Sequence, residues 1–248
     1  MWSYLWQNFL KDFKYKKIIL DKIDKSKIDL SWENLIEVWP GKWAISKYLV
    51  DKFENITFFE KDESFKDIIE GIVNTNHNIV WWDVLEADLI KFEQEKTFVF
   101  WNIPYYITSP IFRKFFVENN FIWWFMLIQK EVWLKIKTDA EKKSFLWWLL
   151  NHWYKVDYVK TVPAKAFNPV PKVDSCLIYL SKLSNPVKIN LNKSIEFLDL
   201  VSWYKRKTMW KIENILRKKW IDKYNIDENI KTKRLEDLNW DDMKKIIL

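Results

Sequence analysis

The chain has 248 residues, of which 49% are hydrophobic and 30% charged, and its net charge is +7 from 41 Lys and Arg against 34 Asp and Glu. This composition excludes a disordered chain and is enough for one sizeable domain with a small appendage. A single cysteine excludes an internal disulfide and is typical of the cytoplasm. The longest apolar run, residues 121–128, is too short to span a bilayer, so no membrane partner is expected. The pI near 9.1 favours a polyanionic partner.

Tryptophan and glycine have exchanged their usual frequencies in this chain. There are 18 Trp and only 2 Gly, whereas glycine ordinarily makes up about 7% of a protein. Trp39 and Trp43 flank Pro40-Gly41-Lys42 directly after an apolar segment, where a nucleotide-binding turn would need residues without a Cβ. We expect that such Trp positions are glycine in the cell, through a genetic code that reads UGA as glycine. The alternative is a genuinely Trp-rich protein, which UGG codons at positions 39, 43 and 101 would establish.

Apolar segments alternate with amphipathic ones from residue 11 to about 130, which predicts an α/β fold with a mainly parallel sheet covered by helices. The expected order is helix 11–25, strand 34–38, helix 44–53, strand 56–60, helix 64–73, strand 78–82, strand 97–101, a helix opening at Ser109-Pro110, strand 125–129 and helix 142–150. Apolar and polar residues alternate in segments 154–162 and 175–183, which predicts an antiparallel pair of strands that completes the sheet.

A polar linker at residues 184–192 separates two expected domains, residues 1–188 with the sheet and residues 189–248 with helices. From residue 193 onward there are 14 Lys and Arg against 10 Asp and Glu, so this quarter of the chain supplies more than half of the net charge. Its basic residues could face phosphates or simply be solvated on a helix surface. They are Lys205, Arg206, Lys207, Lys211, Arg217, Lys218 and Lys219.

Two acidic residues stand at the ends of predicted strands, where doubly wound folds bind their ligands. Glu60 ends the strand 56–60, about 20 residues after the turn, at the position where a carboxylate accepts hydrogen bonds from ribose hydroxyls. Asp83 follows the strand 78–82 and is suited to contact an adenine amino group. Either residue could instead be a helix cap.

A sharper signal follows the strand 97–101 in the tetrapeptide Asn102-Ile103-Pro104-Tyr105. N-x-P-Y at this place is a signature of methyltransferases that act on amino groups. An exocyclic amine is a poor nucleophile because its lone pair is delocalised into the ring. The Asn102 side-chain oxygen and the Ile103 carbonyl can accept its N–H bonds and localise that pair. Pro104 stiffens the turn, and Tyr105 offers a ring on which the base stacks.

Other chemistries fit the sequence less well. Methylation of a pyrimidine carbon needs a cysteine nucleophile, and Cys176 lies in a distant apolar segment. His77 and His152 have no Cys or acidic partner at metal-ligand spacing, so no metal site is expected. A dehydrogenase would share the turn and Glu60 but would not require N-x-P-Y. The turn is not followed by Gly-Lys-Ser/Thr, which argues against a phosphate-binding loop.

Five sequence blocks together resemble the ribosomal RNA adenine dimethylases over nearly the whole chain. Each departure from the family's motifs at a glycine is a Trp, namely Trp6, Trp39, Trp43 and Trp101. The blocks are Leu5-Trp6-Gln7-Asn8-Phe9-Leu10, Glu37–Trp43, Phe100–Tyr105, Gln129-Lys130-Glu131-Val132 and Phe167–Ser175.

The resemblance implies a Rossmann-like class I fold that uses S-adenosylmethionine, with a small all-α C-terminal domain that binds RNA. It also implies roles for individual residues. The cofactor-binding residues would be Gln7, Asn8, Leu10, Trp39 (as glycine), Gly41, Glu60, Asp83 and Asn102. The catalytic residues would be Asn102, Ile103, Pro104, Tyr105 and Phe167, with Tyr105 and Phe167 on either side of the target adenine.

The Q-K-E-V and P-K-V-D-S blocks resemble the housekeeping branch of the family. That branch dimethylates N6 of two adjacent adenosines near the 3′ end of 16S rRNA, late in small-subunit biogenesis. We therefore expect a monomeric, cytoplasmic enzyme whose partner is 16S rRNA in the small subunit or its precursor. Two alternatives stay open: a large-subunit rRNA methylase of the antibiotic-resistance type, and a ribosome assembly factor without catalysis.

Overall fold

The computed structural model describes residues 8–30, 34–71, 73, 75–89, 97–102, 108–117, 121, 123–224 and 226–247. They form two compact units, one of residues 1–133 and 157–182 and one of residues 134–156 and 183–248. The helical unit therefore takes in a segment before the last strands, because residues such as Trp147 and Trp148 share a hydrophobic core with the C-terminal helices. The boundary expected at residue 188 stays a prediction.

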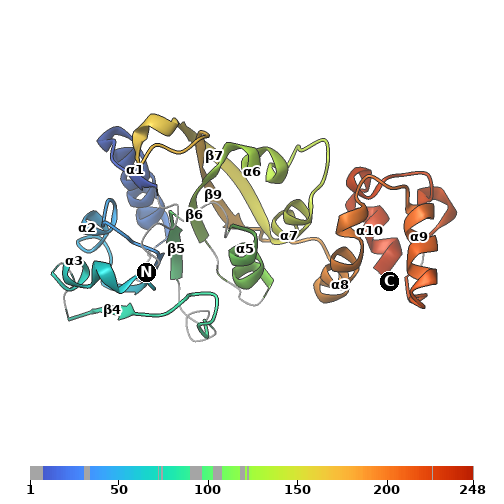
Figure 1. The fold of residues 1–248 in the computed structure, drawn as a ribbon, viewed down its shortest axis with the longest axis horizontal. Helices are drawn as coiled ribbons and strands as arrows, with labels where there is room; N and C mark the ends of the chain where they lie inside the picture. The colour runs from blue at the N-terminus through green and yellow to red at the C-terminus, as the bar shows by residue number, and fades with distance from the viewer. Residues whose placement is uncertain are drawn as a thin grey trace. The chain divides into compact units, whose positions relative to one another are not determined.

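A seven-stranded sheet organises the first unit (Figure 1). Its order is β4-β3-β2-β5-β6-β9-β7, in which β4 to β6 are parallel and β9 is antiparallel to β6. The strands are β2 (Asn34–Val38), β3 (Asn55–Phe59), β4 (His77–Val80), β5 (Thr97–Trp101), β6 (Trp123–Gln129), β7 (Tyr154–Val162) and β9 (Ser175–Lys182). A second, two-stranded sheet pairs β1 (Phe9–Leu10) with β8 (Phe167–Asn168).

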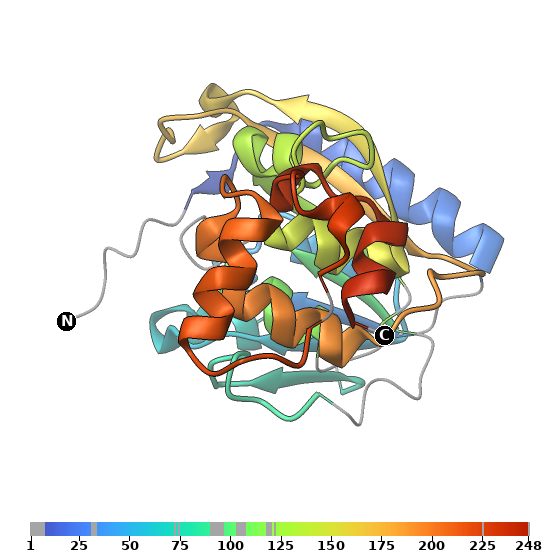
Figure 2. The same ribbon diagram turned by 90° about the vertical axis from the view of Figure 1, so that its right-hand side faces the viewer.

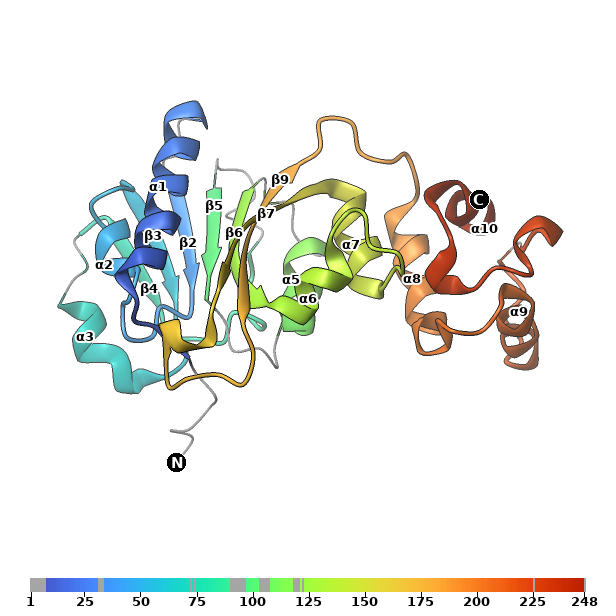
Figure 3. The same ribbon diagram turned by 90° about the horizontal axis from the view of Figure 1, so that it is seen from above.

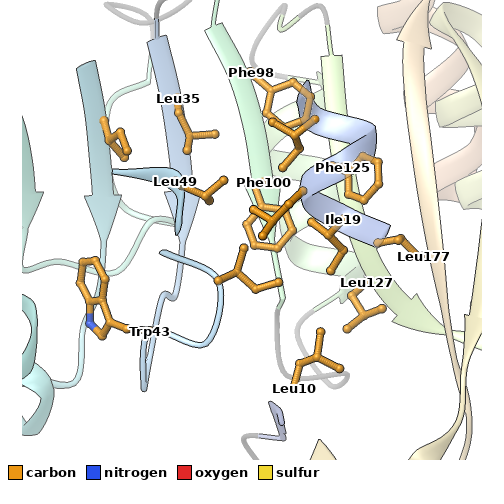
Figure 4. Close-up of a cluster of buried hydrophobic side chains, with 14 of the residues drawn as sticks. Leu10, Ile19, Leu35, Trp43, Leu49, Phe98, Phe100, Phe125, Leu127 and Leu177 are labelled. Atoms are coloured by element: carbon orange, nitrogen blue, oxygen red, sulfur yellow. The ribbon is translucent and has the colours of Figure 1, made fainter. Parts of the chain in front are cut away.

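Helices lie on both faces of the large sheet, as its alternating side chains require. Phe98 and Phe100 of β5 point to the face that Ile19 of α1 covers (Figure 4), and Figure 3 shows the ribbon of α1 beside the strands of the sheet. Trp101 points to the opposite face, where its ring contacts Phe112 at a centroid distance of 5.5 Å. The described helices are α1 (Phe13–Leu30), α2 (Ser46–Leu49), η1 (Glu63–Phe65), α3 (Lys66–Glu70), α5 (Thr108–Val117), α6 (Lys130–Ile136) and η3 (Ala164–Ala166).

The second unit is built of short helices, most of them drawn in orange to red (Figure 2). Ser144 caps α7, since its hydroxyl accepts a hydrogen bond from the backbone N–H of Trp147. Asn239 and Asp242 cap α10 reciprocally, each side chain accepting from the other's backbone N–H. The helices are α7 (Phe145–Trp153), α8 (Leu191–Val201), η4 (Ser202–Tyr204), α9 (Met209–Lys218), η5 (Glu228–Ile230), η6 (Leu235–Asp237) and α10 (Trp240–Ile247). In the described part of the chain, every helix is too short or too polar to cross a membrane.

Candidate active site

The turn after β2 holds three residues in the left-handed backbone region. Trp39, Gly41 and Trp43 have φ values of 54°, 55° and 57°. A Cβ added to Gly41 would lie 2.6 Å from a ring carbon of Phe9, so only glycine fits there. The same backbone conformation at Trp39 and Trp43 is unfavourable for any bulky L residue. The turn predicted at residues 39–43 is therefore present, with a backbone suited to glycine at alternate positions.

Glu60 lies directly after β3 and ties the turn to the neighbouring strand. Its Oε2 accepts a hydrogen bond from the Gly41 N–H at 3.1 Å. Its Oε1 accepts from the N–H groups of Lys61 and Asp62, each at 3.0 Å. The side chain is fully buried, and this burial raises the pKa of Glu60 while the three N–H donors act in the opposite direction. The carboxylate proposed for the ribose thus lies beside the turn, at the carboxyl edge of the sheet.

A second carboxyl group, that of Glu37, lies in β2 beneath the same turn. It is 3% exposed, and its Oε1 accepts a hydrogen bond from the Ser46 hydroxyl at 2.8 Å. Its other oxygen has no partner among the described residues. Burial raises the pKa of Glu37 to about 8, and the nearby Glu60 adds to the rise. Glu37 was assigned no role from the sequence, although an acidic residue within an otherwise apolar strand indicates a buried functional group.

Asp83 follows β4 and is held on both of its oxygens. Oδ1 accepts a hydrogen bond from the Leu85 N–H at 3.0 Å, so the residue caps its own turn. Oδ2 lies 3.2 Å from the Lys61 ammonium group. Lys61 therefore contacts both strand-end acids, through its backbone N–H to Glu60 and through its side chain to Asp83. Lys61 belongs to no motif that the sequence revealed.

A small cavity joins the turn to the other predicted site residues. Its lining includes Asn8 and Phe9 from the N-terminal segment, Trp39 and Gly41 from the turn, and Asn102 after β5. The volume is only about 20 Å³, which is room for about one water molecule. Small-molecule sites are usually about 300–1,000 Å³. The Trp39 side chain, which is 7% exposed, is itself part of the lining of this small cavity.

The N-terminal block and the Phe167 block come together through the small sheet. Leu10 pairs with Phe167 and Phe9 with Asn168. Both Leu10 and Phe167 are 1% exposed and belong to the main hydrophobic core. The role of Phe167 beside a target base stays a prediction, as do the other assigned roles. Gln7, Ile103, Pro104 and Tyr105 lie outside the described residues.

The fold and the strand-end acids define the class of protein. A parallel sheet extended by the antiparallel β9, with helices on both faces and acids after β3 and β4, is the Rossmann-like class I fold of S-adenosylmethionine-dependent methyltransferases. Two solved structures share it. A dimethyladenosine transferase from Plasmodium falciparum aligns with a TM-score of 0.67 at 21% identity, covering 96% of this chain and 95% of that one. The 23S rRNA methyltransferase ErmE aligns with a TM-score of 0.64 at 22% identity, covering 97% and 99%.

Residues 3–247 match the family model described as ribosomal RNA adenine dimethylase, and the chain belongs to this family. It is similar to a protein of Mycoplasma mycoides subsp. mycoides named ribosomal RNA small subunit methyltransferase A. The two are 31% identical over 251 residues, which cover 94% of this chain and 92% of the relative. The predicted family, fold class and use of S-adenosylmethionine as methyl donor are thereby confirmed.

Proposed function

We propose that the chain transfers methyl groups from S-adenosylmethionine to N6 of two adjacent adenosines near the 3′ end of 16S rRNA, late in small-subunit assembly. The family supports adenine dimethylation, and the name of the Mycoplasma relative supports the small subunit. The observation that carries the proposal is the left-handed turn hydrogen-bonded to Glu60 beside Asn102. The enzyme acts as a cytoplasmic monomer on the small subunit or its precursor.

A second part of the proposal is that Trp39 and Trp43 are glycine in the cell, because UGA is read as glycine. Among the described residues, the non-glycine residues with positive φ are Trp39, Trp43 and Trp220, so each one is a Trp. A left-handed conformation costs an L residue about 1–2 kcal/mol. A random placement of bulky residues would not select Trp each time, whereas recoded glycine explains the coincidence.

The buried indole groups support the same conclusion. In the described part of the chain, the indole N–H groups of Trp39, Trp43, Trp101 and Trp148 are buried without a hydrogen-bond acceptor. A Trp N–H usually finds a partner when it is buried, and an unpartnered donor costs about 1–3 kcal/mol. Glycine carries no such group. The recoding therefore extends to Trp101, which stands where the family has glycine in the Phe100–Tyr105 block.

The side chains around the turn suit the cofactor once the indole at position 39 is removed. The Glu60 carboxylate would accept from the ribose hydroxyls and Asp83 from the adenine amino group. When bound, S-adenosylmethionine supplies an electrophilic methyl group on a sulfonium centre. Its site then needs no metal ion, because the sulfonium is already activated.

Asn102 is the residue that prepares the acceptor. It follows β5 at the carboxyl edge of the sheet and lines the cavity beside the turn. As proposed from the sequence, its Oδ1 would accept one N6–H of the adenine and the Ile103 carbonyl would accept the other, which would localise the lone pair of N6. Asn102 and Ile103 would thus hold N6 toward the methyl group that bound S-adenosylmethionine would supply; the sulfur would keep the electrons of the broken C–S bond, and an N6 proton would pass to solvent. Positioning and preformed hydrogen bonds supply the catalysis, and a second round gives the dimethyl product.

The helical unit supplies the RNA-binding surface in this proposal. Phosphate neutralisation by Lys and Arg provides most of the sequence-independent affinity for RNA. All of the basic residues named for this purpose are exposed, and they lie on α9 or next to one of its ends. They are Lys205, Arg206, Lys207, Lys211, Arg217, Lys218 and Lys219.

The test uses the full chain with Trp39→Gly, Trp43→Gly and Trp101→Gly, here called the triple-glycine chain. It is incubated with methyl donor and small ribosomal subunits from cells that lack the gene, with large subunits as the parallel substrate. We expect dimethyladenosine in the 3′ fragment of 16S rRNA by mass spectrometry. Methylation of 23S rRNA alone would favour the resistance-type methylase. Binding to small subunits without methylation or cofactor binding would favour the assembly factor.

A further inference from the structure

The C-terminal end of α9 forms a motif that depends on its backbone conformation. The N–H of Ile221 donates to the carbonyl of Leu216 at 3.0 Å, and the N–H of Trp220 donates to the carbonyl of Arg217 at 3.0 Å. These 6→1 and 5→2 bonds are the two hydrogen bonds of a Schellman motif, with Trp220 at the C′ position. The φ of Trp220 is 59°, as that position requires. The helix therefore ends on a residue in the left-handed conformation.

Glycine is the usual residue at C′ because it has no Cβ to clash in that conformation. An L residue at this position lowers the folding equilibrium constant of the protein roughly tenfold. Burial could offset this loss, but the Trp220 side chain is 95% exposed. The next residue, Ile221, makes the apolar contact with the core that usually accompanies the motif. The indole at position 220 thus adds strain without adding packing.

We propose that residue 220 is also glycine in the cell's protein. The proposal rests on the recoding part of the proposed function but extends it beyond every block shared with the family. Backbone geometry alone selects the position. Its consequence concerns the surface: without the indole, the end of α9 presents the exposed Arg217, Lys218 and Lys219 unaccompanied by an aromatic ring. The competing interpretation is an authentic Trp on which an RNA base stacks.

Mass spectrometry of tryptic peptides from the natural polypeptide tests the recoding in the turn and the glycine at position 220 separately. Residues 43–47 and 220–223 form two such peptides, each with one Trp in the printed sequence. We expect the mass of glycine at both positions. Glycine at 43 with indole at 220 would overturn the inference alone. Indole at both positions would overturn the recoding itself, and indole at 43 with glycine at 220 would remove the recoding from the turn but leave the inference intact.

Stability and RNA binding give an independent test in the triple-glycine chain. Residue 220 is made Trp, Ala or Gly, and the melting temperature is measured by circular dichroism. We expect Trp220→Gly to raise Tm by about 2–8 °C, with Ala below glycine. Trp203→Gly is the matched control, because Trp203 is 90% exposed but lies in η4 without a positive φ; there glycine should lower Tm or leave it unchanged. A fall in Tm with Trp220→Gly, or a tenfold loss of affinity for small subunits at fixed salt, would overturn the inference.

Discussion

Replacing Glu60 by Gln removes one of the three hydrogen bonds that its carboxylate accepts, and only the bond from the Gly41 N–H connects the turn after β2 with the end of β3. The carboxylate accepts from three backbone N–H groups, those of Gly41, Lys61 and Asp62. A Gln side chain has one acceptor oxygen, so its NH₂ group must face at least one of these donors. A hydrogen bond to a charged group contributes about 1.5–3 kcal/mol, and an unpartnered buried donor costs about 1–3 kcal/mol. We therefore expect Glu60→Gln to lower the free energy of unfolding by about 2.5–6 kcal/mol.

Urea denaturation at pH 7.5, followed by circular dichroism, measures this loss in the triple-glycine chain. Glu70→Gln is the control, since Glu70 pairs with Lys66 at the exposed surface of α3 and should contribute less than about 1 kcal/mol. If Glu60→Gln is no more destabilising than Glu70→Gln, Glu60 does not hold the turn, and the reasoning from its three donors is refuted.

Three further predictions concern neighbouring side chains. The pKa of Glu37 is raised to about 8, so the folded state holds a proton that the unfolded state releases near pH 4.5. The free energy of unfolding should therefore fall as pH rises from 5 to 8, by at most about 1.4 kcal/mol per pH unit. Glu37→Gln should abolish this slope in urea titrations, and an unchanged slope would contradict the prediction. Lys61→Met should weaken cofactor binding by up to about fivefold through loss of the half-exposed pair with Asp83, and Lys61→Arg should restore it by calorimetry; equal losses in both variants would refute a role for the charge. Asn102→Ala should lower kcat about 100-fold while cofactor affinity changes far less, and a kcat within threefold would remove Asn102 from the proposed chemistry.

The central strands could be predicted from the sequence because buried parallel strands are continuous apolar segments. Strands 34–38 and 97–101 agree with β2 and β5 residue for residue. The fifth predicted strand begins two residues early, at Trp123, because Trp123 and Trp124 continue the ladder with β5. The predicted helix 44–53 contracts to α2, residues 46–49, since the left-handed Trp43 delays its start.

Other features depend on contacts that periodicity does not report. Strands β1 and β8 contain two residues each and lie far apart in the chain, so no local pattern predicts their pairing. Helix α6 begins directly where β6 ends, within the Q-K-E-V block that we interpreted only as a motif. The strand-end position of Glu60 was predicted, but its hydrogen bond from the Gly41 N–H required the register between β2 and β3. The Lys61–Asp83 pair likewise required β3 and β4 to be neighbours.

Calorimetric titration of S-adenosylhomocysteine, the reaction product, tests whether cofactor binding requires glycine at position 39 of the turn. The triple-glycine chain is compared with the same chain carrying Trp at position 39, where the cavity is only about 20 Å³. We predict micromolar binding by the triple-glycine chain and at least 100-fold weaker binding with the indole, equivalent to about 2.8 kcal/mol. Equal affinity of the two chains would contradict the requirement for glycine in the turn, and absence of binding by the triple-glycine chain would contradict the enzyme assignment.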